Sequence, residues 1–272
     1  MPAPNEISPQ QLLNLIGTPL CPVIVDMRTP DEFGTDPRLV PGAIRHCHTD
    51  MAGLIRRLKE RASVIMCQQG LKLSQSVVSA LQAEGLTCEY LSGGALAWAK
   101  SGAVMVPFEA VPFDADGQTC WITHTCPKIG RIACAWLIRR FIDPEARFLF
   151  VADSKVQAGA ARFNATPFDT PGAEFTHQGD FCTFDSMLER FCLQSRALDC
   201  MAQAIRAAET NRSDLHPVAA GLMAVSDCLS RKFRNDHSQM EAGLALYDGL
   251  YRWARDGQGL GHAWPAVPAR RS

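Results

Sequence analysis

Hydrophobic positions in the first part of the chain follow two alternating patterns. Short runs centred on apolar residues have the length of buried strands. These runs are residues 22–28, 62–67 and 87–93. The segments after them place apolar residues three and four positions apart, which is typical of amphipathic helices. This alternation predicts an α/β domain with a central, mainly parallel sheet and helices on both of its faces.

The pattern changes in the second part of the chain. Residues 120–125 and 147–153 have the apolar character of strands, whereas residues 166–182 are rich in turn formers. After Thr183, apolar residues recur with helical spacing almost to the end of the chain. We therefore expect an α+β domain in which helices dominate.

A segment with prolines and an Asp-Gly pair separates the two patterns. This composition is typical of a linker. We expect a first domain, a linker, a second domain and a loose tail, in that order. Their expected bounds are residues 1–103, 104–119, 120–256 and 257–272.

Composition limits the partners and the cellular location that can be expected for this protein. The 272 residues carry a net charge of -1, so bulk charge gives no reason to expect nucleic acid or an anionic membrane as a partner. The N-terminus lacks the apolar core of a secretory signal, and no apolar run is long enough to span a bilayer. The 11 cysteines are odd in number and scattered, which favours a reducing, cytoplasmic location over a disulfide framework.

One cysteine stands where a buried strand is expected to end. In open α/β sheets, ligands bind at that edge, and backbone N–H groups at the start of a helix can hold an anion and favour a thiolate. The expected nucleophile is Cys67, and the alternative is a buried cysteine that only fills the core. The expected substrate-binding loop consists of Gln68, Gln69, Gly70, Leu71 and Lys72.

Three further segments give residues 7–102 a resemblance to the rhodanese, or sulfurtransferase, domain family. They are "VIVDMRTPDEF", "VPGAIR" and "YLSGGALAW", and they occur in the family's order around the Cys67 loop. The resemblance implies that the cysteine takes sulfane sulfur from thiosulfate or another donor. The sulfur is then carried as a persulfide that loop amides stabilise, and a thiol or a cyanide-like acceptor removes it. No cofactor is required for this step.

The length of the Cys67 loop distinguishes this chain from the related cysteine phosphatases. Those enzymes place an arginine six positions after the cysteine, where this chain has Leu73. The loop ends at Lys72, whose charge lacks the bidentate fork of an arginine. Asp26 and Arg28 follow the first strand, and they either frame the pocket as an ion pair or hold the loops as a structural pair.

Two basic residues stand near a predicted helix start in the second domain. Thr125 or Cys126 is the expected cap and Pro127 the first helical position. Lys128 and Arg131 are three positions apart, so they share a face of this helix. They form either an oxyanion site at the helix N-terminus or a solvated basic face.

A second set of residues has the chemistry of metal ligands. The chain has only seven histidines, and one of them begins a helix that carries a glutamate four positions later, on the same face. Such residues suit a non-haem iron, manganese or zinc site. The candidate ligands are His177, His237, Glu241 and Asp236. The alternatives are a helix cap for Asp236, a solvent-facing Glu241 and a turn position for His177.

The second domain resembles the C-terminal domain of the ChrB chromate-resistance family from about Trp121 to Trp253. Four segments carry the likeness: "PKIGRIACAWLIRRFIDPEA", "TPFDTPGAEFTHQGDFCTFD", "AAGLMAVSDCLSRKF" and "DHSQMEAGLALYDGLY". The resemblance implies a chromate-responsive regulator or an accessory protein, with chromate as a partner. This chain departs from the family's usual arginines at His124 and Cys126 and from its aspartate at Gly130, which makes His124 and Cys126 additional soft ligand candidates.

Two functional hypotheses follow. The first is a sulfurtransferase with Cys67 as persulfide carrier, fused to a domain that binds a metal and an oxyanion. The second is a chromate- or metal-responsive sensor or binding protein without sulfur turnover. The fused first domain and the near-neutral charge argue against a DNA-binding regulator. No oligomeric state is predicted.

Overall fold

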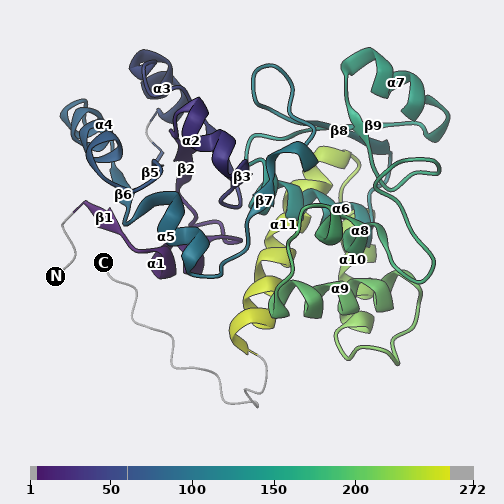
Figure 1. Cartoon of the computed structure of the whole chain (residues 1–272). Helices are drawn as coiled ribbons and strands as arrows, with labels where there is room; N and C mark the ends of the chain where they lie inside the picture. The colour runs from purple at the N-terminus through teal and green to yellow at the C-terminus, as the bar shows by residue number, and fades with distance from the viewer. Residues whose placement is uncertain (1–4, 60, 258–272) are drawn as a thin grey trace.

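A five-stranded sheet forms the centre of the first half in the computed structural model, which describes residues 5–59 and 61–257. Its strand order is β1-β6-β5-β2-β4 and every neighbouring pair is parallel (Figure 1). β5 is therefore an inner strand, which places the residue that follows it at the middle of the sheet edge. The strands are β1 (Glu6–Ile7), β2 (Val23–Asp26), β4 (Ala43–Arg45), β5 (Ser63–Met66) and β6 (Cys88–Leu91).

Helices cover both faces of this sheet, as the sequence predicts. Side chains alternate along each strand, so Val25 and Ile65 join one apolar cluster while Ile24 and Val64 join another. The first cluster includes residues of α3 and α4, and the second includes residues of α1 and α5. The helices of this half are α1 (Pro9–Leu15), α2 (Pro30–Thr35), α3 (Met51–Leu58), α4 (Lys72–Ala83) and α5 (Gly94–Lys100).

Local signals in the sequence account for the ends of several helices. Ser8 caps α1 in a capping box, with Pro9 in the first turn. Thr29 does the same for α2, which also begins with a proline. Gly85 follows α4 with a φ of 80°, a left-handed conformation that favours glycine and ends the helix.

The segment predicted as a linker packs against the first half. Its residues Val106–Pro107 form β7, which pairs in antiparallel fashion with β3 (Arg38–Leu39). Met105, Val106 and Val111 are buried in the larger apolar cluster, which also holds Ile24 and Val64 and is called the main core below. The prolines and the Asp-Gly pair therefore mark turns and a short 3-10 helix, Phe108–Ala110, in a docked segment rather than a solvated tether.

A smaller sheet and six helices form the second half. Its strands β8 (Cys120–His124), β9 (Arg147–Val151) and β10 (Thr166–Pro167) are parallel and lie in the order β10-β8-β9. One face of β8 packs on α7, and its other face, with Trp121, packs into the main core. The helices are α6 (Ile129–Leu137), α7 (Val156–Phe163), α8 (Thr183–Arg190), α9 (Arg196–Glu209), α10 (Ala219–Lys232) and α11 (Asp236–Arg252).

Helix α6 begins two residues later than the sequence predicts. Cys126 has a φ of 59°, so it lies in the left-handed region and does not cap a helix. The capping position is Lys128, and α6 starts at Ile129. At its other end, α6 continues as a π-helical turn, Ile138–Ile142, which covers the rest of the predicted helical run.

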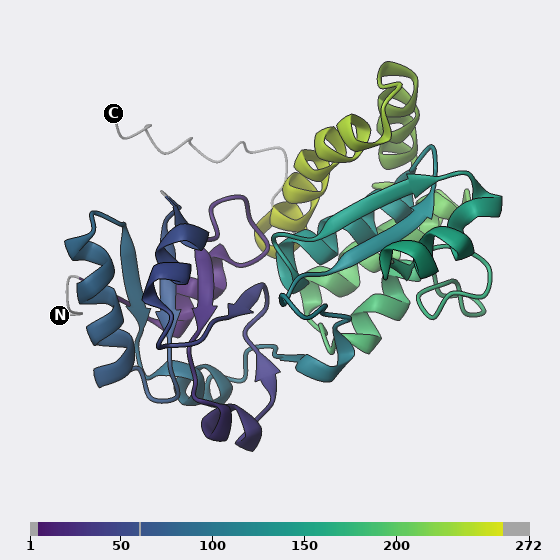
Figure 2. The same cartoon turned by 90° about the horizontal axis from the view of Figure 1, so that it is seen from above.

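The two halves share one apolar core and lie side by side (Figures 1 and 2). Gly17 approaches the rings of Phe141 and Tyr251 so closely that a Cβ there would lie 2.6 Å and 2.5 Å from them. In addition, Glu145 of the second half binds Arg57 at 3.1 Å and Arg61 at 2.7 Å. Apolar packing and ion pairs therefore both join the halves.

Within residues 5–59 and 61–257, no helix combines the length and apolar character needed to cross a bilayer. A second π-helical turn, Trp253–Gly257, ends the described chain. The rest of the predicted tail, residues 258–272, lies outside the described residues.

Candidate functional site

Cys67 follows β5 directly and is 5% exposed. Its position on an inner parallel strand places the thiol at the carboxyl edge of the sheet, as the sequence predicts. The thiol donates a hydrogen bond to Ser74 Oγ at 3.3 Å, and the Ser74 hydroxyl donates to the carbonyl of Leu71 at 3.1 Å. Ser74 lies in the first turn of α4, so the thiol and the helix start are held together.

The loop after Cys67 turns its carbonyls toward α5. The carbonyl of Cys67 accepts from the amide of Ala95 at 3.0 Å, and that of Gln68 accepts from Leu96 at 3.1 Å. Within the described part of the chain, the amides of residues 68–71 donate no hydrogen bond. α4 also begins without a side-chain cap. The loop thus offers several unpaired N–H groups beside a helix N-terminus, which is an arrangement that attracts anions.

Two glycines allow the Cys67 loop to cross the start of α5 with backbone against backbone. Gly70 and Gly94 have φ values of 65° and 59°. A Cβ on Gly94 would lie 2.3 Å from the carbonyl oxygen of Cys67 and 2.5 Å from the amide nitrogen of Gly70. Any side chain at Gly94 would therefore displace the loop that carries the thiol.

Asp26 and Arg28 form a buried ion pair at the end of β2, next to the Cys67 strand. Their side chains are in contact at 2.6 Å, and the guanidinium is 1% exposed. Its remaining donors bind the backbone carbonyls of Asp36 at 2.9 Å and Arg38 at 2.6 Å. Because these bonds occupy the guanidinium, the geometry favours the structural alternative, in which the pair holds the loop after β2.

The other predicted residues of the loop differ in exposure. Gln69, Leu71 and Lys72 are exposed, whereas Gln68 is half-buried and its Oε1 has no hydrogen-bond partner within the described residues. Lys72 is the first residue of α4, so its charge lies close to the unpaired amides. Residues 68–72 thus form one continuous segment between the Cys67 thiol and the start of α4.

The structure does not bring the four predicted metal ligands together. Asp236 accepts a hydrogen bond at 3.0 Å from a backbone amide of the β8–α6 loop, and Glu241 pairs with Arg139 at 3.6 Å. The ring of His237 packs edge-on against Phe150, with centroids 5.1 Å apart. His237 and Glu241 do share α11, but the turn with His177 lies beside the end of α9 instead. Helical spacing predicts which residues share one face of a helix, but it does not predict which other segment packs against that face.

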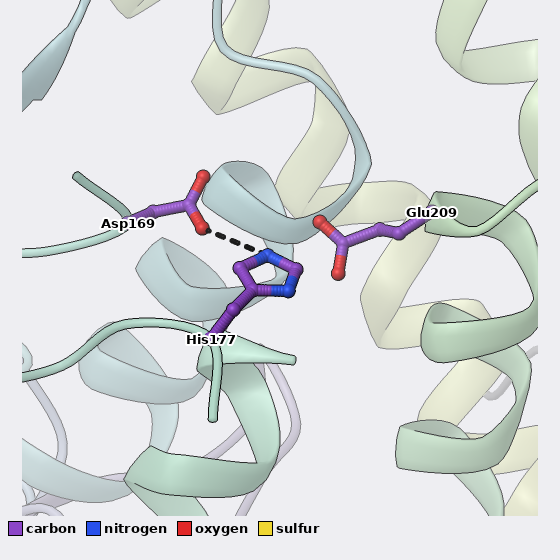
Figure 3. A group of neighbouring side chains, drawn as sticks. All are labelled: Asp169, His177 and Glu209. Carbon is purple, nitrogen blue, oxygen red and sulfur yellow. Dashed lines mark ion pairs between the residues drawn. The ribbon is translucent and has the colours of Figure 1, made fainter. Parts of the chain in front are cut away.

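A different cluster gathers around His177. Asp169, His177 and Glu209 each offer a ligand atom, and these atoms lie within 4.8 Å of one another. The imidazole of His177 lies between the two carboxylates, and its Nε2 is 3.4 Å from Asp169 Oδ1 (Figure 3). Asp169 follows β10, His177 lies in the turn-rich segment and Glu209 ends α9.

Neighbouring groups fix the Asp169 carboxylate. The hydroxyl of Thr183 donates to its Oδ1 at 2.6 Å, and Arg131 Nε lies 3.4 Å from its Oδ2. Burial lowers the pKa of the Arg131 guanidinium, although the charge of Asp169 opposes this shift. Asp169 is therefore held by a helix start on one side and by a cation from α6 on the other.

Burial acts more strongly on the Glu209 carboxylate than the nearby His177, Arg131 and Cys182 side chains, which favour its charged form. Burial, followed by the negative charge of Asp169, raises its pKa from 4.5 to about 7. Its Oε2 is buried and has no hydrogen-bond partner among the described residues. Its Oε1 occupies the space where a Cβ on Gly130 would lie, at 1.9 Å. The glycine in α6 thus makes room for this carboxylate.

The predicted oxyanion residues are paired with carboxylates. Lys128 Nζ binds Asp227 at 3.1 Å, and Arg131 contacts Asp169. Arg131 also contacts the ring of His124. An anion at the start of α6 would compete with these carboxylates, so the arrangement gives little support to an oxyanion site there. Cys126 is exposed, and it is not part of the cluster around His177.

Sequence reasoning missed Asp169 and Glu209. Asp169 lies in a turn-rich segment where an acidic residue is ordinary, and Glu209 falls at the end of a helix where it looks like a solvated residue. The positive φ of Asp169, 51°, distinguishes this position, but it is a property of the folded chain and not of the sequence.

Two domain families match the chain. The rhodanese-like domain matches residues 8–101, and the domain described as ChrB, C-terminal domain, matches residues 121–254. "Protein ChrB" from Cupriavidus metallidurans is 34% identical over 132 residues, which are 48% of this chain and 39% of that protein. The chain therefore spans less than half the length of this curated relative.

Solved structures resemble the first half. A thiosulfate sulfurtransferase from Pseudomonas aeruginosa is 25% identical, with 38% of this chain and 19% of that chain covered and a TM-score of 0.32. A rhodanese-related protein from Thermoplasma volcanium is 20% identical, with 38% and 97% covered and a TM-score of 0.33. The two family matches confirm both resemblances noted in the sequence, and the chain joins a rhodanese-like domain to a ChrB C-terminal domain.

Proposed function

We propose that this chain is a sulfurtransferase that carries sulfane sulfur as a persulfide on Cys67. The observation that carries the proposal is the thiol at the end of β5, next to unpaired loop amides and the uncapped start of α4. Such a site suits a reaction in which negative charge develops on sulfur beside the cysteine. The rhodanese-like family match supports the same chemistry.

Each half-reaction is a displacement at sulfur. The Cys67 thiolate attacks the outer sulfur of thiosulfate, a new S–S bond forms, and sulfite leaves with the electron pair of the bond that breaks. A nucleophile such as cyanide or a thiolate then attacks the outer persulfide sulfur. This step forms thiocyanate or a new persulfide and returns the Cys67 thiolate with its electron pair. The loop amides hold the negative outer sulfur, and Lys72 adds positive charge at the mouth of the site.

The experiment is an assay of the full chain with thiosulfate and cyanide, in which thiocyanate is measured. We expect turnover in the wild type and only the uncatalysed rate in Cys67→Ser, because serine cannot form a persulfide. Cys47→Ser removes an exposed thiol elsewhere and serves as the matched control, which should keep the wild-type rate. Equal rates for Cys67→Ser and wild type would exclude the proposed mechanism.

All eleven cysteines carry thiols rather than disulfides, and all lie within the described residues. A persulfide carrier surrounded by thiols suits a reducing compartment, so we place the proposed reaction in the cytoplasm. Thiols of other molecules would then be the acceptors, and cyanide would be their substitute in the assay.

A second candidate function is ligand binding without sulfur turnover, as in a chromate- or metal-responsive sensor. The cluster at Asp169, His177 and Glu209 favours it, because these side chains have no part in the Cys67 reaction. The thiosulfate assay separates the two functions: a protein that binds a metal but forms no thiocyanate is a binding protein.

A further inference from the structure

The cluster of Asp169, His177 and Glu209 is built like a metal site from residues far apart in the chain. One imidazole and two carboxylates present their ligand atoms within 4.8 Å of one another. Ligands that share an ion with bonds of about 2.0–2.2 Å must approach each other on this scale. The imidazole points between the two carboxylates in Figure 3, so the three side chains face a common point.

The Glu209 carboxylate supplies a second, independent observation. Its Oε2 is buried without a hydrogen-bond partner among the described residues, although buried carboxylates are normally satisfied. The side chain is directed toward His177 (Figure 3). Although the Cys182 thiol interacts with this carboxylate, Oε2 itself has no partner among the described residues and is therefore available as a ligand atom.

The surroundings match those of a metal ligand set. Thr183 and Arg131 bind the Asp169 carboxylate and fix its orientation, as outer groups do around metal ligands. Gly130 leaves the space that Glu209 Oε1 occupies. When ionised, the two carboxylates and the Arg131 guanidinium together carry one excess negative charge, so a divalent cation is electrostatically favoured.

The cluster also has access to solvent. The His177 side chain is 50% exposed, and this residue lines a cavity of about 560 Å³. Cys182, Arg206 and Arg212 line the same cavity. An ion bound by three protein groups would keep positions open toward this cavity, as catalytic and ligand-binding metal centres do.

We propose that Asp169, His177 and Glu209 bind one divalent transition-metal ion, with its open coordination positions facing the cavity. Imidazole nitrogen with carboxylate oxygen suits Mn²⁺, Fe²⁺ or Zn²⁺. The site replaces the ligand set predicted around α11, of which it keeps only His177. It does not depend on Cys67, so it stands or falls separately from sulfur transfer.

Manganese is the sharpest probe, because the chain has 11 thiols that would also bind zinc. The full chain is stripped with a chelator and titrated with Mn²⁺, and the signal of free Mn²⁺ is followed by electron paramagnetic resonance. The metal content of the protein as purified is measured in parallel. We expect one Mn²⁺ per chain, and about a 100-fold or larger loss of affinity in His177→Ala and Glu209→Gln.

Three control variants and one further substitution test the assignment. His237→Ala and Glu241→Gln remove the ligands predicted from sequence, and both should bind Mn²⁺ like the wild type. Gly130→Ala keeps every ligand but places a methyl group where Glu209 Oε1 lies, so we expect about a 10-fold weaker affinity. Gly221→Ala, in α10 with no atom within 4 Å of its Cβ position, should have no effect. Circular dichroism verifies that each variant folds.

Three results would overturn the proposal. The first is no stoichiometric Mn²⁺ uptake together with no iron, manganese or zinc in the purified protein. The second is unchanged metal binding in folded His177→Ala and Glu209→Gln. The third is loss of binding in the His237 or Glu241 variants, which would return the site to α11.

Discussion

The two candidate sites of this protein are built in opposite ways. The Cys67 site uses the thiol and backbone amides of one continuous loop between β5 and α4. The cluster in the second half uses side chains from three separate segments that meet only in the folded chain. A site of the first kind is visible in local sequence, because strand end, loop and helix start follow one another. A site of the second kind depends on how distant segments pack.

The sites also differ in the charge that they attract. Loop amides and the start of α4 direct partial positive charge at the Cys67 thiol, which suits a sulfur anion. The other site directs two carboxylates at a common point, which suits a cation. The two candidate sites therefore differ in kind: the proposed anion site is made of backbone, and the proposed cation site is made of side chains.

The largest effect is expected at the ion pair that holds the loop beside the Cys67 site. Arg28→Ala leaves the Asp26 carboxylate, which is 0% exposed, without its main partner. We expect a loss of about 3–5 kcal/mol in the free energy of unfolding, measured with urea. Arg38→Ala, which removes an exposed pair with Asp36, is the control and should cost less than about 1 kcal/mol. Comparable losses in both variants would mean that the buried pair has no special role.

Backbone contact at the Cys67 loop can be tested without touching the thiol. Gly94→Ala would place a Cβ 2.3 Å from the carbonyl oxygen of Cys67, so we expect thiocyanate formation to fall about 100-fold. Gly102→Ala has a similar φ, 74°, but no atom within 4 Å of its Cβ position. This control carries the same backbone strain and should keep most of the activity. If both variants lose activity equally, strain and not loop displacement is responsible.

The smallest effect is expected where the two halves meet. Burial would raise the pKa of the Glu145 carboxyl, but the hydrogen bonds and charges of Arg61 and Arg57 lower it below 4.5. A lowered pKa stabilises the folded state above the unfolded pKa, and this contribution is lost as the pH falls through the folded value. Glu145→Gln should therefore cost about 1 kcal/mol of unfolding free energy at neutral pH and almost nothing well below pH 4.5.

The control for Glu145→Gln is Glu174→Gln, which removes an exposed pair with Arg190 within the second half. It should change the urea midpoint little at any pH. A pH-independent loss in Glu145→Gln would show that the contact between the halves does not depend on the charge of this carboxylate.

Local patterns predicted the first half well and the second half less completely. Continuous apolar runs placed β2 and β5 close to their observed bounds, because these strands are buried on both faces of the sheet. The segment after α5 was predicted as a linker, and its packing against the first half could not be predicted, since turn-forming residues mark a change of direction and say nothing about exposure. The α6 start was also displaced, because the left-handed backbone of Cys126 is held by a carboxylate from α11.

The metal ligands show the same limit. His177 was a candidate on chemistry alone, but its neighbours were sought on α11, where His237 and Glu241 share a face. In the fold, β9 and the π-helical turn after α6 occupy that face, and α9 brings Glu209 to His177. Spacing within one helix says which residues lie together on its surface. It carries no information about which other helix covers them.

The amino-acid sequence by itself determined the parallel sheet, the position of Cys67 at its edge and the loop that begins α4. These features follow from neighbouring residues, whose apolar spacing, glycines and helix signals act over a few positions. Only the tertiary structure decided that the segment after α5 docks and that Asp169, His177 and Glu209 converge. Their convergence depends on the packing of β10, α6 and α9, and long-range packing leaves no periodic trace in the sequence of any one segment.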